Sequence, residues 1–470
     1  MAEKPILIIQ MQRLGDLVLS YPLLGWLSHL YPESPLWVVG EEMFFSELME
    51  LSPKATYFTH ASAPALRKTA FRLVINLSHR QEAVDLAGSL KTEERIGAYR
   101  DRPGGAMFIN GEWQLYRASL VHNNRYNLYH WADMNALDVV PPNRMRMTQW
   151  PLPRETRPTA SGHIGLFLGA SEKDKHPDAA FWISLAGELL RVGHRPVLLG
   201  GEAEKPLGAE VARALDAPAL NLTGHFSVSA LCRFLQELDL FVTPDTGPMH
   251  LAVWTGTPVL NLSMGPVNAW ETGPFSPGHY VLRAALPCMG CWHCTQSSVL
   301  CKKALHANRT AFLIHELVSQ KEAGLRRIAL PDQELLRTAR DGHALFHLEQ
   351  RLGDTPPRQV TALFWQAFFG NRAKIFSDAE LAAAWQAFAL ASPGNGPAFT
   401  QALVKLGKDL SLHLRGRRGS TVNSETFWAS FPLPLRPLTS YIHLSLQNGM
   451  FQAPAFAKAL ELVERLAALR

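Results

Sequence analysis

The chain has 470 residues, a length that suggests two or three domains rather than one core. With 47% hydrophobic and 19% charged residues, it has the balance of a soluble globular protein, which excludes general disorder. A formal net charge of +5 spread over this length slightly favours anionic small molecules or an anionic membrane surface. It does not form the dense basic stripe of a nucleic-acid-binding protein, so no nucleic-acid partner is expected.

The amino-terminal residues show neither a secretory signal nor a membrane span. MAEKPILIIQ has a short apolar run with no small-residue cleavage pattern after it. The stretch LVLSYPLLGWLSHLY contains Pro22, Ser28 and His29 and is too short and too polar to cross a bilayer. We therefore expect a cytoplasmic protein, with peripheral contact to the inner face of the cytoplasmic membrane as a further expectation.

The first part of the chain, residues 1–150, predicts a Rossmann-like α/β domain. Continuous apolar runs of strand length occur at 5–10, 36–40 and 73–78, as in strands buried on both faces. A helical stretch at 17–31 separates the first two. Such alternation is typical of a parallel sheet with helices on both faces.

A second α/β domain is predicted over residues 160–325. Residues 141–162 are rich in Pro, Arg and Thr and are typical of an interdomain linker. The strand pattern then restarts with HIGLFLGAS (163–171) and RPVLLGG (195–201), with helices between and after them.

The third part, residues 330–470, is predicted to be a helical extension. Apolar residues at a spacing near 3.6 occur from 333–352 onward, and strand signals nearly vanish. No repeat of fixed period is evident there.

The segment DLFVTPDTGPMHLAVWTGTPVLNL (239–262) predicts a strand, a tight turn, a helix and a second strand. Thr246 suits the N-cap position, Gly247 removes side-chain bulk, and Pro248 suits the first helical turn. The helix then directs free N–H groups and the positive end of its dipole beyond the strand, where a diphosphate would fit. An ordinary capped βα turn explains these residues equally well.

Three further signals follow predicted strands. GASEKDKHP (169–177) offers small residues with Ser171, and Lys175 could neutralise a phosphate, although a loop lysine is usually only solvated. Glu202 in LLGGEAE could hold ribose hydroxyls or simply match a helix dipole. Asp16 in RLGDL could take a proton from an acceptor hydroxyl, or serve as a helix N-terminal carboxylate.

Dinucleotide, P-loop and hydrolase motifs are missing. The sequence has no G-x-G-x-x-G after the first strand, no G-x-x-x-x-G-K-[ST] and no G-x-S-x-G. Oxidoreductases, P-loop enzymes and α/β-hydrolases therefore lose their main support.

Over roughly residues 1–320 the chain resembles glycosyltransferase family 9, the ADP-heptose:lipopolysaccharide heptosyltransferases. The segments that carry the resemblance are RLGDLVLSYPLL, GASEKDKHP, GGE and DTGPMHLA. The resemblance implies a GT-B fold, in which two Rossmann-like domains with parallel sheets face each other across the active site. The first domain would bind a glycolipid acceptor of the lipopolysaccharide-core type, and the second a nucleotide sugar, ADP-heptose above all. The reaction would be inverting and would need no metal or other cofactor for catalysis.

The resemblance also assigns roles to individual residues. Asp16 would be the catalytic base, Ser171 and Lys175 would meet the diphosphate, and Glu202 the ribose. The donor pocket at the helix start would be lined by Asp245, Thr246, Gly247, Pro248 and His250. Losing one such contact should cost about 2–4 kcal/mol of barrier.

Two departures from the family pattern leave other functions open. The family's GPT-D-P loop is represented here by SMGPVNAWETGPFSP, in which the Thr and the Asp are replaced by other residues. The tail of about 140 residues lies outside the usual family enzyme. A non-catalytic nucleotide-binding partner module is one alternative. A related transferase that acts on a protein or another polysaccharide is the other.

Four cysteines lie close together in PCMGCWHCTQSSVLC, namely Cys288, Cys291, Cys294 and Cys301. Thiolates at this spacing suit a tetrahedral zinc site or an iron–sulfur cluster. A structural or redox-labile loop without metal is the third interpretation, and the sequence leaves all three open.

Overall fold

The structure is a computed structural model. It describes residues 3–102, 104–146, 161–215, 219–320, 322–325, 327–353, 356, 358–391, 396–416, 422 and 424–469. Most of the expected linker, residues 147–160, lies outside this part of the chain.

The amino-terminal domain contains a six-stranded sheet in the order β3-β2-β1-β4-β5-β6. Its strands are β1 Ile6–Ile9, β2 Leu36–Val39, β3 Thr56–Phe58, β4 Ala70–Asn76, β5 Lys91–Arg100 and β6 Met107–Asn110. All neighbours pair in parallel except β5 and β6. The central strand β1 is buried at every residue because helices cover both faces of the sheet.

The amino-terminal domain has two helices, α1 and α2, where the sequence predicts one helix over residues 17–31. The helices of this domain are α1 Leu14–Leu19, α2 Tyr21–Leu30, α3 Glu42–Phe45, α4 Ala63–Leu66, α5 Gln81–Ser89, α6 Glu112–Ser119, α7 Trp131–Met134 and α8 Pro142–Met145. The expected helix over 17–31 is divided at Ser20, which ends α1 and begins α2. Pro22 in the first turn of α2 explains the division, because its ring cannot continue an uninterrupted helix.

The second sheet has eight strands in the order β14-β13-β12-β11-β10-β7-β8-β9. They are β7 His163–Phe167, β8 Arg195–Leu199, β9 Leu220–Asn221, β10 Leu240–Pro244, β11 Val259–Ser263, β12 Tyr280–Ala284, β13 Gln333–Arg340 and β14 Phe346–Leu352. The six strands β7 to β12 pair with their neighbours in parallel, and β13 and β14 join the sheet antiparallel. Two mostly parallel sheets with helices confirm the predicted α/β class.

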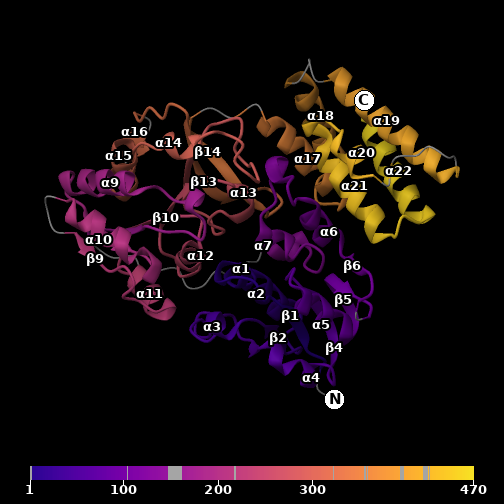
Figure 1. The fold of residues 1–470 in the computed structure, drawn as a ribbon, viewed down its shortest axis with the longest axis horizontal. Coiled ribbons are helices and arrows are strands. Elements are labelled where there is room, and N and C mark those ends of the chain that lie inside the picture. Colours follow the sequence, from indigo (N-terminus) through magenta and orange to yellow (C-terminus); the bar gives the residue numbers. More distant parts are fainter. Residues whose placement is uncertain are drawn as a thin grey trace.

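The remaining helices flank the second sheet or form the tail. Around the sheet lie α9 Ala179–Arg191, α10 Lys205–Arg213, α11 Val228–Leu235, α12 Gly247–Trp254, α13 Ala269–Thr272, α14 Leu300–Lys303, α15 Ala307–Val318 and α16 Glu322–Leu325. The tail contains α17 Arg358–Arg372, α18 Asp378–Ala391, α19 Gly396–Leu414, α20 Glu425–Ala429, α21 Arg436–Asn448 and α22 Ala453–Ala468. The helical carboxy-terminal region is thus present (Figure 1). In the described residues, no helix is both long and apolar enough to span a membrane.

Residues 333–352 form a β-hairpin, so the helix expected there is wrong. The turn begins at Asp341-Gly342, a pair typical of tight turns, and the Asp341 carboxylate accepts the N–H groups of His343 and Leu345 at 2.9 Å each. β13 then pairs along β12, which satisfies its backbone groups within the sheet. We propose the three-part domain division with this hairpin counted in the second part.

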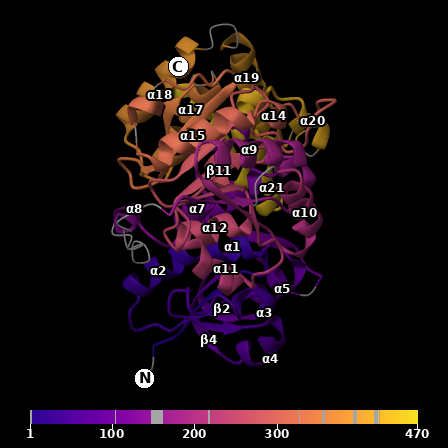
Figure 2. The same cartoon turned by 90° about the vertical axis from the view of Figure 1, so that its left-hand side faces the viewer.

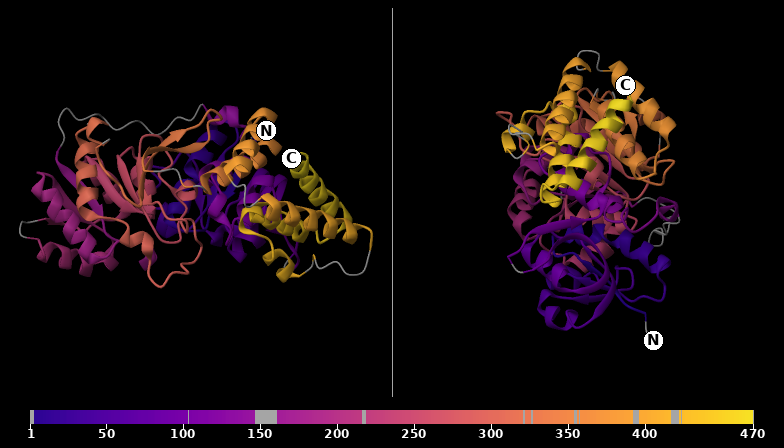
Figure 3. Two further views of the ribbon diagram at one scale, coloured as in Figure 1. Left: turned by 90° about the horizontal axis from the view of Figure 1, so that it is seen from above. Right: turned by 90° about the vertical axis from the view of Figure 1, so that its right-hand side faces the viewer.

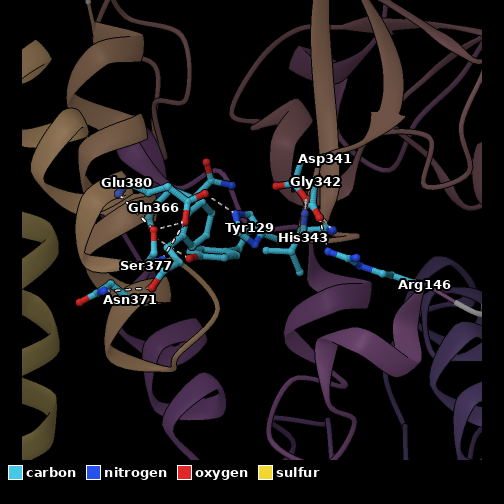
Figure 4. A network of polar contacts seen from close by, with 11 residues as sticks. Tyr129, Arg146, Asp341, Gly342, His343, Gln366, Asn371, Ser377 and Glu380 are labelled. Carbon is cyan, nitrogen blue, oxygen red and sulfur yellow. Dashed lines mark hydrogen bonds and ion pairs between the residues drawn. The ribbon is translucent and has the colours of Figure 1, made fainter.

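The helical tail packs on the amino-terminal domain, although it follows the second sheet in the chain (Figures 1 and 3). The Tyr129 hydroxyl donates to the carbonyl of Gln366 in α17 at 2.6 Å, as the close view shows (Figure 4). Asn448 of α21 accepts the Ile109 N–H of β6 at 2.7 Å and donates to its carbonyl at 2.9 Å. One hydrophobic core runs from the first sheet into the tail.

Candidate functional site

A cleft of about 800 Å³ opens where the carboxyl ends of strands from both sheets face each other. The loops after β1, β7, β10 and β11 all reach it, as expected for ligand sites in open α/β sheets. The predicted catalytic and donor-binding residues that line it are Asp16, Ser171, Lys175, Asp245, Thr246, Gly247, Pro248 and His250. The structure therefore brings together residues that lie more than 200 positions apart in sequence.

Helices α1 and α12, one from each domain, meet at their first turns beside this cleft (Figure 2). A Cβ atom on Gly15 would lie 3.4 Å from the Cα of Gly247 and 3.0 Å from Cδ2 of His250. A Cβ on Gly247 would lie 3.4 Å from the Gly15 nitrogen. The two glycines thus permit a close backbone approach, which places Asp16 next to the start of α12.

Asp16 lies in the first turn of α1 and lines the cleft. Burial raises the pKa of its carboxyl above the ordinary value, and the nearby Arg117 and Arg13 guanidinium groups oppose that rise. The backbone N–H of Arg13 donates to Oδ2 at 3.2 Å and fixes the carboxylate. A carboxylate with a raised pKa, held in a cleft, is suited to accept a proton from a bound hydroxyl.

The loop after β7 carries the predicted phosphate-binding residues. Lys175 forms an ion pair with Glu172, with 2.8 Å between Nζ and Oε1. The Ser171 hydroxyl accepts a hydrogen bond of 3.1 Å from the Arg13 guanidinium of the opposite domain. A cation and a hydroxyl are therefore present in the cleft next to the start of α12.

Glu202 is not among the residues that line the cleft. Its side chain is largely exposed and pairs with Lys205 at 2.8 Å. The neighbouring Glu204 packs where a Cβ on Gly169 would lie and accepts the Gly201 N–H at 2.8 Å. The ribose-binding role of Glu202 stays a prediction.

Thr246 is the N-cap residue of α12, as the sequence predicts. Its side chain makes no capping hydrogen bond. Pro248 has no N–H and the Met249 N–H donates to the Thr246 carbonyl at 3.0 Å, so the Gly247 N–H is the first-turn donor that remains for a ligand. Asp245 accepts the Thr272 hydroxyl, and burial raises its pKa to about 6. Burial lowers the pKa of His250 to about 4, which keeps the imidazole neutral near pH 7.

The loop after β11, in which Thr and Asp of the family pattern are replaced, joins the two domains. Asn268 donates to the carbonyls of Asn124 and Asn127 at 2.9 and 3.0 Å. The side-chain amides of the same two residues donate to the Glu271 carboxylate at 2.9 and 3.1 Å. We call these four contacts the interdomain latch. Burial raises the pKa of Glu271 to about 7.

The sequence interpretation missed Arg117 of α6, which also lines the cleft. Its guanidinium donates to Asn135 at 2.7 Å, and its Cζ lies 4.7 Å from the centre of the Trp131 ring. His79 lines the cleft too. Burial, and to a smaller extent the positive charge of Arg117, lowers the pKa of His79 to about 4. No local motif marks either residue, because only the fold brings them to the cleft.

The cysteine loop closes one side of the cleft, to which Trp292, His293 and Cys294 contribute. The ring of His122 in the first domain lies 5.0 Å from Trp292. All four cysteines are free thiols, and Sγ of Cys301 accepts the Gly265 N–H at 3.2 Å. In the part of the chain that the structure describes, no group of three or more His, Cys, Asp or Glu residues is arranged to hold a metal ion. The zinc and iron–sulfur interpretations of this loop are therefore unsupported.

The sequence model of glycosyltransferase family 9 (heptosyltransferase) matches residues 59–301, which is more than half of the chain. The chain belongs to this family.

Known members of glycosyltransferase family 9 resemble the chain in sequence. Lipooligosaccharide heptosyltransferase 2 of Campylobacter jejuni, serotype O:2, is 30% identical over 135 residues, which cover 27% of this chain and 42% of that protein. The corresponding protein of serotype O:6 is 29% identical over 135 residues, which again cover 27% of this chain and 42% of that protein. The chain thus matches less than half the length of these curated relatives.

Solved structures of the family share the fold. A glycosyl transferase family 9 protein from Veillonella parvula matches with a TM-score of 0.52 and 18% identity, covering 68% of this chain and 98% of that one. ADP-heptose lps heptosyltransferase II of E. coli matches with a TM-score of 0.50 and 18% identity, covering 68% and 99%. The predicted GT-B arrangement of two facing Rossmann-like domains is confirmed.

Proposed function

We propose that the chain is an inverting, metal-independent glycosyltransferase. It moves a heptose or a related sugar from a nucleotide-diphosphate sugar, ADP-heptose above all, to a glycolipid acceptor of the lipopolysaccharide-core type. The observation that carries the proposal is the cleft lined by Asp16 of the first domain and by Lys175 and the start of α12 of the second. Family membership agrees with this assignment.

In the proposed mechanism, the donor diphosphate lies against Ser171, Lys175 and the first turn of α12, with Asp245, Thr246, Gly247, Pro248 and His250 around it. Asp16 removes the proton from the acceptor hydroxyl as its oxygen attacks the anomeric carbon from the side opposite the diphosphate. The bond to the diphosphate breaks, and the configuration inverts. Lys175 and the helix N-terminus stabilise the charge that develops on the leaving diphosphate.

The acceptor would bind on the first-domain side of the cleft, where Trp131 and Arg117 lie. A glycolipid acceptor would place the enzyme at the inner face of the cytoplasmic membrane. The formal charge of +5 is compatible with weak attraction to an anionic surface.

The deciding experiment compares turnover and donor binding with purified full-length protein. ADP-, GDP- and UDP-sugars are screened for stabilisation and for transfer, and the Asp16→Asn variant is tested with the donor that succeeds. We expect Asp16→Asn to keep donor affinity but to lose about 100-fold or more in turnover, because a general base typically contributes that much. Full turnover of Asp16→Asn would remove the proposed base, and binding of none of the donors would remove the proposed activity.

A further inference from the structure

Arg13 connects the two sides of the cleft at a point that the proposed mechanism does not use. It is the residue before α1, at the end of the loop that follows β1, and its side chain is exposed to the cleft. Its guanidinium donates to the Ser171 hydroxyl of the second domain at 3.1 Å. The backbone N–H of the same residue donates to the Asp16 carboxylate at 3.2 Å. One residue therefore contacts both the predicted phosphate loop and the predicted base.

The charge of a nucleoside diphosphate exceeds what the second domain offers. Lys175 is the one cation of the predicted diphosphate site, and Glu172 already neutralises it at 2.8 Å. The amino terminus of α12 adds a partial positive charge of about one half. A diphosphate brings at least two negative charges, so a further cation would stabilise both the bound donor and the leaving group.

The guanidinium of Arg13 has the position and the free capacity for this task. In the described residues it forms the hydrogen bond to Ser171 and no ion pair with a carboxylate. Its planar fork of N–H donors matches two phosphate oxygens at once. The hydroxyl that it contacts belongs to the loop where the diphosphate is proposed to lie. A phosphate oxygen between Ser171 and Lys175 would therefore be within its reach.

We propose that Arg13 is a donor-binding residue supplied by the acceptor domain, which grips the diphosphate while its own backbone holds Asp16 in place. This inference rests on the proposed function, since it requires a nucleotide-diphosphate sugar in the cleft. Donor binding then reaches across the two domains and fixes the spacing between the diphosphate and the base. Arg13 contacts the leaving group directly and positions Asp16 through the main chain.

The binding test uses the full chain and three variants. Arg13→Gln removes the charge, Arg13→Lys keeps it without the fork, and Arg67→Gln is a matched control, because Arg67 is an exposed arginine of the same domain whose contact is Ser89, outside the cleft. Calorimetry measures the affinity of each protein for ADP, GDP and UDP, and for the matching nucleoside without phosphate. For the nucleotide that binds the wild type, we expect Arg13→Gln to bind about tenfold or more weakly, as for loss of a charge-assisted hydrogen bond.

The pattern of losses separates the explanations. Arg13→Lys should recover part of the affinity, Arg67→Gln should bind like the wild type, and the affinity for the bare nucleoside should be the same in all four proteins. Unchanged diphosphate affinity in Arg13→Gln would overturn this inference while leaving the proposed function intact. An equal loss for the nucleoside and the diphosphate would also overturn it, since the effect would then come from the fold. If the wild type binds no nucleoside diphosphate, the proposed function falls and this inference with it.

A kinetic measurement tests whether the Arg13 charge also acts on Asp16. Loss of the Arg13 charge removes one of the groups that lower the Asp16 pKa, so the acid limb of the pH profile of kcat/KM should move to higher pH in Arg13→Gln. The donor KM should rise in the same variant. A raised KM with an unmoved pH limb would leave the Arg13 side chain as a binding group alone and would overturn the action of its charge on Asp16.

Discussion

At the scale of single residues, the cleft places a carboxylate where two opposing influences act on its proton affinity. Burial raises the pKa of Asp16, and Arg117 is the largest influence that lowers it. A base works only when ionised, so activity is expected to fall as the pH falls through this raised pKa. Arg117 therefore keeps the proposed base ionised to lower pH than burial alone would allow.

Replacing Arg117 tests this electrostatic role. In Arg117→Met, the pKa of Asp16 should rise further, and the acid limb of kcat/KM should move to higher pH, because the opposing positive charge is gone. The Arg117→Lys variant keeps the charge and should retain most of the wild-type profile. A pH profile of Arg117→Met that coincides with the wild type would show that the guanidinium does not act on the base.

Glu172 competes with the proposed donor for Lys175. Its carboxylate pairs with Lys175, so an incoming diphosphate must displace it. Glu172→Gln should bind nucleoside diphosphates more tightly, by a factor of about 2 to 5, since a half-exposed ion pair contributes about 1 kcal/mol or less. Calorimetry measures the change, and weaker binding by Glu172→Gln would place the diphosphate away from Lys175.

At the scale of secondary-structure elements, the latch between the segment at 124–127 and the start of α13 couples ionisation to stability. The folded pKa of Glu271 is about 7, above its ordinary 4.5, because burial disfavours the charged form more than its hydrogen bonds favour it. A raised carboxyl pKa contributes stability below about pH 4.5 that is lost as the pH rises through about 7.

The latch therefore predicts a pH-dependent stability. Between pH 5 and 8 the free energy of unfolding should decrease by up to about 3 kcal/mol from this group. The Glu271→Gln variant should lack this part of the pH dependence, although its amide loses one of the two contacts with the asparagines. Denaturant titrations of both proteins at several pH values provide the measurement. An identical pH slope in the two proteins would contradict the assignment.

Local sequence chemistry predicted the elements that carry the proposed donor site. Thr246 at the N-cap of α12 follows from capping preferences alone, and Gly256 just after that helix has a positive φ of 79°, a conformation that glycine adopts readily. The strands that precede these loops are short apolar runs with clear boundaries. The positions of Asp16 and Lys175 in one cleft then follow from the topology of such sheets.

Contacts between distant segments could not be predicted in the same way. The hairpin at 333–352 has helical apolar spacing, and its pairing with β12 overrides that local preference. Arg117 and Glu271 sit within helices whose sequences show no motif, and only the tertiary fold brings them to the cleft. The role of the changed loop in joining the domains likewise depends on the loop at 124–127.

At the scale of the whole molecule, buried polar contacts tie both sheets together. Asp133 of the first domain is fully buried and accepts a hydrogen bond from Arg340 of β13 at 2.9 Å and one from the backbone N–H of Phe346 at 2.7 Å. Around them, one core contains residues of the first sheet, the hairpin and the tail. A chain connected in this manner is expected to unfold as one cooperative unit.

Breaking this ion pair should destabilise the whole molecule. Arg340→Met leaves the Asp133 carboxylate buried without its partner and should cost about 3–5 kcal/mol, whereas Arg340→Met combined with Asp133→Asn should recover much of that loss. Denaturation followed by tryptophan fluorescence and by circular dichroism measures both the free energy and the coincidence of the two transitions. Separate transitions in the wild type would contradict a single unit.

The latch also bears on the timing of the catalytic cycle. Four buried hydrogen bonds join the two walls of the cleft, so widening the slot would require breaking them. In many enzymes the opening of a lid or a domain limits turnover. Where the walls stay joined, departure of the product requires no such opening, and kcat should respond only weakly to the viscosity of the solvent.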